Sequence, residues 1–361
     1  MLISMREQVS TTFGLLSKVG GECAGSIVLL PDGEEPQAPI YQQLTWEQVR
    51  ALTYNGTRIE EREEIERAAQ GLPKPRMSIS GAQYKLLLYI QKDEKPSRPM
   101  GSSPSTHILK PDIVRPDINV FASAANETII MLAAHKCGLP TAKVSYQPVT
   151  HACLIERYDR KLGEDGVVRR VWQADFCQLL GKSSEVKYEY DGGPNFNDCF
   201  ALLKQSTQPG VDQRNLLRWL FFNLYTGNND SHAKNLSMIA SGRGMRLAPF
   251  YDLMCTRVYT GLGSRFAFSI AGESDPEQLT VAHFVELAKS LSIGPKYLQK
   301  LAKEMADAVE EAVPAATVQV IPLLEPSQRV LAERVIEKVG SIIRRMRKRI
   351  AGEDSASQVD A

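Results

Sequence analysis

The stretch of sequence that decides the fold is Gly227-Asn-Asn-Asp-Ser-His-Ala-Lys-Asn235, after which an apolar, strand-like segment leads to Tyr251-Asp252. It places Asp230 five residues before Asn235, with Asp252 downstream. In phosphoryl transfer by kinases, one carboxylate positions the attacking hydroxyl, while an Asn five residues later and a second Asp hold the magnesium ions. The pattern therefore predicts a phosphoryl-transfer centre, with Asp230 as catalytic base and Asn235 and Asp252 as metal ligands.

A structural alternative fits the same residues. Asn-Asn-Asp-Ser is also typical of a turn held by side-chain-to-backbone hydrogen bonds, and such turns are far commoner than active sites. Short motifs produce many false matches. The rest of the chain has to decide between the two interpretations.

Composition indicates an ordinary globular protein. The chain has 361 residues and is 43% apolar, which is enough for two lobes with a sizeable core. Its formal net charge of +1 gives no overall attraction to nucleic acid or to an anionic membrane.

The six cysteines are widely spaced, without a Cys-x-x-Cys pair or a matching His cluster, so neither a zinc site nor a disulfide framework is indicated. The N-terminus lacks a signal-peptide pattern, and no apolar run is long enough to span a bilayer. A cytoplasmic protein with reduced thiols is expected.

The first part of the chain alternates apolar runs with loops and charged segments. We expect a strand at 25–30, a loop at 31–39, a charged helix at 58–67, a linker at 71–75, strands at 85–90 and 106–110 around a polar stretch at 95–105, and two strands within 139–156. Residues 119–137 carry apolar positions at helical spacing and end at Gly138, a typical C-cap.

The second part is mainly helical. Helices are predicted at 173–181, 195–205, 214–226, 280–292, 295–313 and 327–351, interrupted by one hairpin at 235–250. A strand-rich first half and a helical second half predict an α+β fold with two lobes, and a cleft between lobes is a common place for a ligand.

A cation should reach the nucleotide phosphates from the first lobe, and Lys110 at the end of His-Ile-Leu-Lys is the best candidate. Glu127, on the helix that follows, can supply the carboxylate that orients the amine, as in the strand-lysine and helix-glutamate pair of kinases. The alternative is a solvated charge at the end of a strand.

Three further sets of residues are candidates for nucleotide binding or support. The loop that contains Ser80, Gly81, Ala82 and Gln83 could fold over phosphates, although an ordinary turn fits it as well. Glu156, Arg157 and Tyr158, at the change of lobes, fit either a nucleobase pocket or a structural hinge. His232 is expected to act as local scaffolding that donates to a neighbouring carbonyl or carboxylate, and Lys234 as a supporting residue.

Seven blocks in this order resemble the HipA-type serine/threonine kinase toxins. They are Ser-Ile-Ser-Gly-Ala-Gln83, His-Ile-Leu-Lys110, Asn126-Glu127, Ile-Glu-Arg-Tyr-Asp-Arg160, Asp175-Phe-Cys-Gln-Leu-Leu-Gly181, Gly227 to Asn235, and Tyr251-Asp252. The most specific block is Asp-x-His-x-Lys-Asn followed by Tyr-Asp.

The resemblance implies a two-lobed protein-kinase-like fold with a β-rich N-terminal lobe and a mainly helical C-terminal lobe. Residues 1–75 would be a truncated N-terminal subdomain and linker, 76–160 the N-lobe and 161–361 the C-lobe. It also implies ATP and Mg²⁺ as cofactors, Lys110 on the ATP phosphates, and inhibitory autophosphorylation at Ser78, with Ser80 as a further candidate.

Two departures from the family pattern refine the expectation. The chain begins at a segment that lies well inside longer members, a pattern similar to the short HipT-type toxins. There a small HipS-like protein replaces the missing subdomain, and a HipB-like DNA-binding antitoxin completes the system. The second departure is Trp-Gln-Ala-Asp175, where the family often has His-Gln-Glu-Asp, so a role for Asp175 is not carried over.

The leading hypothesis is a toxin kinase of a bacterial toxin-antitoxin system that phosphorylates an aminoacyl-tRNA synthetase, tryptophanyl or glutamyl. The alternatives are a catalytically silent scaffold that binds its antitoxin, and a small-molecule or lipid kinase of similar fold. The basic run at 344–349 lies at the end of a predicted helix, where it complements the helix dipole, so DNA contact is expected through the partner alone.

Overall fold

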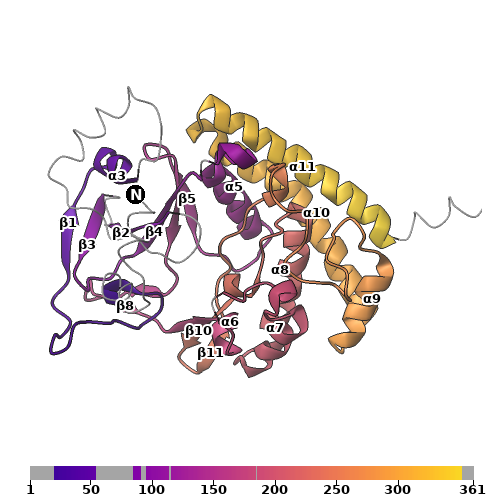
Figure 1. Cartoon of the computed structure of the whole chain (residues 1–361), viewed down its shortest axis with the longest axis horizontal. Coiled ribbons are helices and arrows are strands. Elements are labelled where there is room, and N and C mark those ends of the chain that lie inside the picture. The colour runs from indigo at the N-terminus through magenta and orange to yellow at the C-terminus, as the bar shows by residue number, and fades with distance from the viewer. Residues whose placement is uncertain (1–19, 54–83, 91–94, 114, 184, 352–361) are drawn as a thin grey trace, which may run out of the picture. The chain divides into compact units, whose positions relative to one another are not determined.

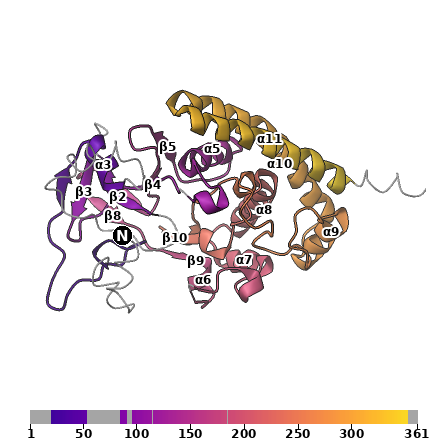
Figure 2. The ribbon, with the colours of Figure 1, turned by 45° about the horizontal axis from the view of Figure 1, so that its top comes forward.

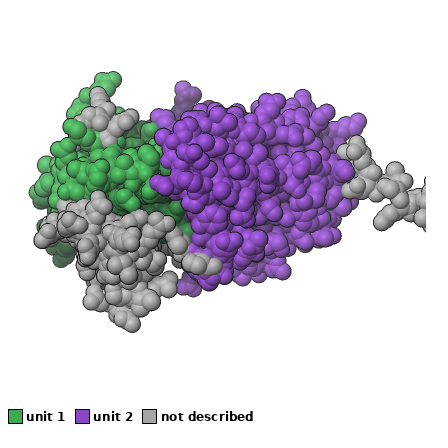
Figure 3. Space-filling model, turned by 90° about the horizontal axis from the view of Figure 1, so that it is seen from above, with its two compact units in different colours: residues 1–113, 145–173 green, residues 114–144, 174–361 purple. Residues whose placement is uncertain are grey.

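The computed structural model describes residues 20–53, 84–90, 95–113, 115–183 and 185–351. The chain divides into two compact units, which Figure 3 colours separately: unit 1 comprises residues 1–113 and 145–173, and unit 2 comprises residues 114–144 and 174–361. Strands dominate unit 1 and helices dominate unit 2 (Figure 1), so the predicted α+β class is confirmed.

Unit 1 is built on a six-stranded sheet with the order β1-β3-β2-β4-β6-β5. Its strands are β1 (Ile40–Gln43), β2 (Leu86–Ile90), β3 (Pro96–Met100), β4 (His107–Pro111), β5 (Val144–Gln147) and β6 (Ala152–Glu156). β2 alternates buried and half-buried residues, and its Leu86 and Leu88 pack with Leu109 and with Val49 of helix α3 (Trp46–Thr53). This cluster is the core of unit 1.

The strands predicted at 85–90 and 106–110, and the two within 139–156, are confirmed. The strand predicted at 25–30 is wrong: its Ile27 and Leu29 are largely exposed, and no strand lies there. The polar stretch at 95–105 contains the strand β3, which the sequence did not predict. Proline has no N–H to donate, but the Pro96 carbonyl still accepts the Leu44 N–H at 2.9 Å, so Pro96 is compatible with the strand. The sequence also missed β1, α3 and the hairpin of β7 (Arg160–Leu162) and β8 (Val168–Arg170).

Unit 2 is a helical assembly around one largely buried helix, α5 (Ser123–Lys136). Its other helices are α6 (Phe176–Leu179), α7 (Phe196–Leu202), α8 (Pro209–Thr226), α9 (Val281–Ser290), α10 (Pro295–Val320) and α11 (Pro326–Ala351). Figures 1 and 2 show α10 and α11 running side by side next to α5, and α10 contacts α5, α8, α9 and α11. α5 is buried around almost its whole circumference, as expected for a helix inside a core.

Each long helix of unit 2 overlaps its predicted range, although α8 begins before the predicted residue 214, and the hairpin is confirmed as β10 (Ser237–Ser241) and β11 (Gly244–Leu247). β9 (Gln173–Asp175) completes a three-stranded sheet with them, so only residues 176–179 of the helix predicted at 173–181 are helical. α10 continues past its predicted end through Pro314. A proline has no backbone N–H and therefore removes one hydrogen bond of the helix, but the packing of α10 against the other helices of unit 2 stabilises it across Pro314.

All six cysteines are free thiols, of which Cys23 is partly exposed and the other five are buried. Within the described residues, no helix combines the length and the apolar character that crossing a membrane requires. The predicted elements at 58–67 and 71–75 lie outside the described residues.

Candidate active site

The predicted catalytic loop begins where α8 ends. Gly227 caps α8 with a left-handed φ of 68°. A Cβ at this position would lie 2.8 Å from Cδ1 of Ile342 and 3.1 Å from Cβ of Arg257. Glycine is therefore required both by the backbone conformation and by the close approach.

The residues after Gly227 form a turn held by their own side chains. Asn228 donates from Nδ2 to Oδ1 of Asn223 at 2.7 Å, and its Oδ1 accepts the Asp230 N–H at 3.3 Å. Asn235 donates from Nδ2 to the Asp230 carbonyl at 2.9 Å. The turn that we considered as the alternative is thus present, and it is the scaffold that positions Asp230.

A second set of bonds ties the loop to the chain beyond Asp252. Thr256 donates from Oγ1 to the Gly227 carbonyl at 3.0 Å, and the same oxygen accepts the Asn229 N–H at 2.8 Å. The Asn229 amide donates to the Ser264 carbonyl at 2.8 Å. Every group in this set is neutral.

Asp230 is the exposed carboxylate of the loop. Its side chain is 54% exposed, whereas the neighbouring His232 side chain is 6% exposed. The Tyr188 hydroxyl donates to Oδ1 of Asp230. A carboxylate held on a rigid loop and able to accept a hydrogen bond from a hydroxyl has the arrangement of a general base.

His232 does not make the bond expected of it. Its Nε2 lies 3.8 Å from Oδ1 of Asp230, beyond hydrogen-bonding distance, and Nδ1 has no hydrogen-bond partner within the described part of the chain. Burial lowers the pKa of His232 to about 4, although the charges of Asp230 and Asp252 oppose the shift. The imidazole is therefore neutral near pH 7, and it packs edge-on against the Tyr188 ring at 5.1 Å.

Asn235 and Asp252, the predicted metal ligands, are joined through their neighbours. The Tyr251 hydroxyl donates to the Lys234 carbonyl at 2.7 Å, which ties the residue before Asp252 to the residue before Asn235. Asp252 has a φ of 61°, a conformation that is strained for most residues and frequent at functional sites. Because Nδ2 of Asn235 donates to the Asp230 carbonyl, the side-chain oxygen Oδ1 of Asn235 is the atom available to a cation. Oxygen donors of this kind suit Mg²⁺.

The segment that carries Asp252 is fixed from inside the core by Asn126 of α5. Asn126 accepts the Cys255 N–H at 2.8 Å and donates to the Cys255 carbonyl at 2.9 Å. The sequence motif that contains Asn126 does not predict this role. Its signal in the sequence is a polar side chain among the apolar positions of a predicted helix.

Asp175 has a structural role. It caps α6 by accepting the Gln178 N–H at 2.8 Å. Burial raises the pKa of its carboxyl, and the charge of the half-buried Lys234 opposes that shift.

The predicted nucleotide residues are distributed over both units. Lys110, in β4 of unit 1, is 4% exposed, so the alternative of a solvated strand-end charge is excluded. Glu127, in α5 of unit 2, is 2% exposed.

The predicted hinge residues differ in exposure. Glu156 ends β6 opposite His107 and is exposed. The half-buried Tyr158 donates from its hydroxyl to Oε1 of Gln173 at 2.5 Å. Ser78, Ser80, Gly81, Ala82 and Gln83 lie outside the described residues.

A buried group of charges beside Tyr158 was not predicted. The Glu22 cluster consists of Glu22, Arg157, Asp159, Arg160 and Arg170, all in unit 1. Glu22 accepts from Arg157 at 2.9 Å and from Arg160 at 3.0 Å, and the Glu22 and Asp159 side chains are 8% and 4% exposed.

The carboxylates of the Glu22 cluster stay charged despite their burial. Burial alone would raise the pKa of Glu22 and of Asp159, but the guanidinium groups of Arg157 and Arg160 outweigh it, and both pKa values are lowered. The cluster clamps the chain at residues 20–25 to the predicted hinge, because the Gly25 N–H donates to Oδ2 of Asp159 at 2.7 Å.

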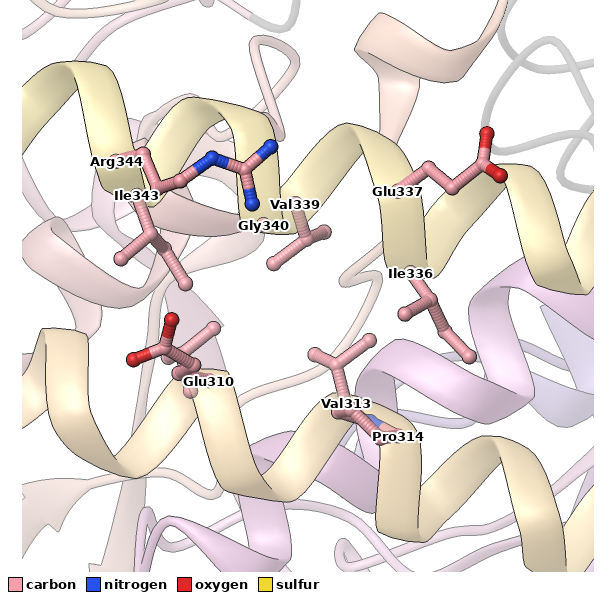
Figure 4. A pocket seen from close by; sticks show the side chains of 10 residues that line it. Glu310, Val313, Pro314, Ile336, Glu337, Val339, Gly340, Ile343 and Arg344 are labelled. Carbon is pink, nitrogen blue, oxygen red and sulfur yellow. The ribbon is translucent and has the colours of Figure 1, made fainter.

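A groove between α10 and α11 encloses about 480 Å³ (Figure 4). It is lined mainly by apolar side chains such as Val313, Ile336 and Val339, together with Glu310 and Arg344. None of the predicted site residues lines it, so it is separate from the chemistry considered above.

Comparison with known proteins identifies the family of the chain. The family described as the HipA-like C-terminal domain matches residues 77–315 of this chain. The chain belongs to the HipA family. Its predicted two-lobed kinase-like fold and its predicted class, a protein serine/threonine kinase, are confirmed by the following relatives of the family.

The protein Y4mE of Sinorhizobium fredii, which is named as a kinase, is 35% identical over 311 residues that cover 83% of this chain and 71% of that protein. The serine/threonine-protein kinase toxin HipA of Shewanella oneidensis is 28% identical over 348 residues, covering 90% of this chain and 74% of that protein. The solved structure of HipA from Shewanella oneidensis MR-1, in a complex with HipB and operator DNA, has a TM-score of 0.78 at 26% identity and covers 100% of this chain and 84% of that one.

Proposed function

We propose that this HipA-family chain is a toxin kinase that transfers the terminal phosphoryl group of ATP to a serine or threonine hydroxyl of another protein. One observation carries the assignment to Asp230. Its half-exposed carboxylate stands on a buried loop and accepts a hydrogen bond from a hydroxyl. Asp230 would orient the substrate hydroxyl and take its proton as the phosphoryl group is transferred.

The other roles follow the sequence prediction. Asn235 and Asp252 would hold Mg²⁺, which when bound with ATP neutralises charge on the phosphates. Lys110 would reach the phosphates and Glu127 would orient it, and the burial of both side chains supports functional rather than solvent-facing roles. Glu156 and Tyr158 are proposed for the adenine, and Ser80, Gly81, Ala82 and Gln83 for the phosphates.

The finer parts of the proposal rest on the family resemblance. The substrate would be an aminoacyl-tRNA synthetase, tryptophanyl or glutamyl, and autophosphorylation at Ser78 or Ser80 would inhibit the enzyme. A HipB-like antitoxin is supported by the HipA complex with HipB and operator DNA. A small HipS-like partner, the HipT-type subclass and a cytoplasmic location stay predictions, the last supported by the free thiols.

The deciding experiment measures phosphate transfer from labelled ATP with Mg²⁺ by the purified chain, to itself and to a panel of aminoacyl-tRNA synthetases. Asp230→Asn keeps the shape of the side chain and removes the base, so transfer should fall about 10²–10⁴-fold. Asp32→Asn, at an exposed position of unit 1, is the matched control and should leave transfer unchanged. Equal transfer by wild type and Asp230→Asn would exclude Asp230 as the base, and a chain that neither binds ATP nor labels any protein would instead fit the antitoxin-binding scaffold.

A further inference from the structure

Tyr188 reaches Asp230 from a short segment of unit 2 that the proposed function does not use. The tyrosine segment, residues 187–193, contains one 3-10 turn, Glu189–Asp191. Its Glu189 carboxylate accepts the Ser269 N–H at 2.7 Å and also the Ser269 hydroxyl. The Gly193 N–H donates to the Tyr188 carbonyl at 2.8 Å. The backbone around Tyr188 is thus anchored beside the catalytic loop.

The Tyr188 ring is held on three sides. It stacks on Tyr190 with the ring centroids 5.0 Å apart, the Lys187 Nζ lies 4.7 Å from its centroid, and the edge of His232 completes the contact. These contacts point the hydroxyl at Oδ1 of Asp230. Because Tyr190 is 52% exposed, the stack can be rearranged without opening the core.

A kinase base has to accept a hydrogen bond from the substrate hydroxyl before transfer. In this structure the Asp230 oxygen accepts that bond from Tyr188. Burial raises the pKa of the Tyr188 phenol, and the bond to Asp230 raises it further, so the group keeps its proton and remains a donor at neutral pH.

We propose that Tyr188 occupies the acceptor-hydroxyl subsite of this kinase, so that a substrate hydroxyl must displace the Tyr188 hydroxyl to reach Asp230. This inference rests on the proposed role of Asp230. It makes Tyr188 a residue that competes with the substrate and thereby restricts which hydroxyls reach the base.

Tyr188→Phe is the test, because it keeps the stacked ring and removes only the hydroxyl. The acceptor used is dephosphorylated casein, with labelled ATP and Mg²⁺. The KM for casein should fall about tenfold with kcat unchanged, since a competing hydrogen bond to a charged group is lost. Tyr190→Phe is the matched control: it removes a neighbouring phenol whose hydroxyl is not the one bonded to Asp230, and its KM should equal that of wild type.

Three results would overturn the inference: a KM unchanged in Tyr188→Phe, a kcat that falls with it, or phosphate found on Tyr188 itself after incubation with ATP. The last would make Tyr188 an acceptor rather than a competitor.

A second measurement does not depend on activity. Ultraviolet titration of the phenols at alkaline pH, taken as the difference between each chain and its Tyr188→Phe counterpart, isolates Tyr188. In the Asp230→Asn background Tyr188 should ionise at lower pH than in wild type, because the carboxylate is gone. An unchanged titration would show that the contact is absent and overturn the inference, whatever the kinase assay gives. A shifted titration in a chain without kinase activity would place the failure in the proposed function.

Discussion

Two regions next to predicted functional residues are held in opposite ways. The Glu22 cluster of unit 1, beside Tyr158, consists of five charged side chains. The predicted catalytic loop of unit 2 is held by amides, hydroxyls and backbone groups. A charged network loses much when one member is removed, because the remaining charges stay buried, whereas a neutral network loses one bond at a time. The difference predicts distinct responses to mutation and to pH.

The largest effect is expected for Glu22→Ala, which leaves Arg157 and Arg160 with Asp159 alone and removes the carboxylate that pairs with Arg170. Removing one partner from a buried ion network costs about 3–5 kcal/mol. The free energy of unfolding, measured with urea, should fall by that amount. Glu34→Ala, at an exposed position of unit 1, is the matched control and should stay within about 0.5 kcal/mol of wild type. If the two variants were equally stable, the cluster would not hold the chain together as described.

The second prediction separates the two regions by pH. The pKa of His232 is about 4 in the folded chain against an ordinary 6.5, so the unfolded chain binds the proton first. The contribution of His232 to the free energy of unfolding is complete above pH 6.5 and declines as the pH falls toward 4, by on the order of 3 kcal/mol at most. Glu22 and Asp159 have lowered pKa values, so their contribution is present above about 4.5 and is lost only below it.

Amide hydrogen exchange measures the loss of stability in these two pH ranges at individual residues. The Asn228 amide, bonded to the Asn223 carbonyl at 2.9 Å, should lose protection between pH 6.5 and 4, and the Gly25 amide only at lower pH. His232→Gln should abolish the first window, while His135→Gln, at an exposed end of α5, should leave both windows intact. Loss of protection at both amides in the same pH range would contradict the division.

The smallest effect is expected for Asn126→Ala, which breaks two neutral bonds to Cys255. The unpaired backbone groups should cost about 1–3 kcal/mol in the free energy of unfolding. Asn197→Ala, at an exposed position in α7, provides the comparison and should change little. A loss for Asn126→Ala as large as that for Glu22→Ala would remove the distinction between charged and neutral scaffolds.

The fold could be predicted where the pattern is local. The long helices of unit 2 follow from apolar spacing, and β4 and β6 from short apolar runs. The run at 25–30 shows the limit, because an apolar stretch becomes a strand only if a partner strand lies beside it, and the sequence does not show whether one does. β3 was hidden by Pro96 and Pro99, which normally argue against a strand.

The candidate site likewise contains residues that a local sequence pattern predicts and residues that it does not. Asp230, Asn235 and Asp252 could be proposed from the sequence because kinase chemistry fixes the spacing of the first two and requires a second Asp downstream. Tyr188 lies 42 residues from Asp230, and Arg157 lies 135 residues from Glu22, so no local pattern connects either pair. Such contacts follow from the tertiary fold, which a single sequence does not reveal.

The thiol of Cys23 lies where its rate of alkylation depends on the Glu22 cluster. Its carbonyl accepts from Arg157 at 3.1 Å and from Arg160 at 2.8 Å, and it is the one cysteine of the six that is partly exposed. Burial and the adjacent Glu22 charge raise the pKa of its thiol, which slows alkylation. Opening of this corner would uncover the thiol and speed its alkylation, so the labelling rate with iodoacetamide measures how often the corner opens in the unmodified protein.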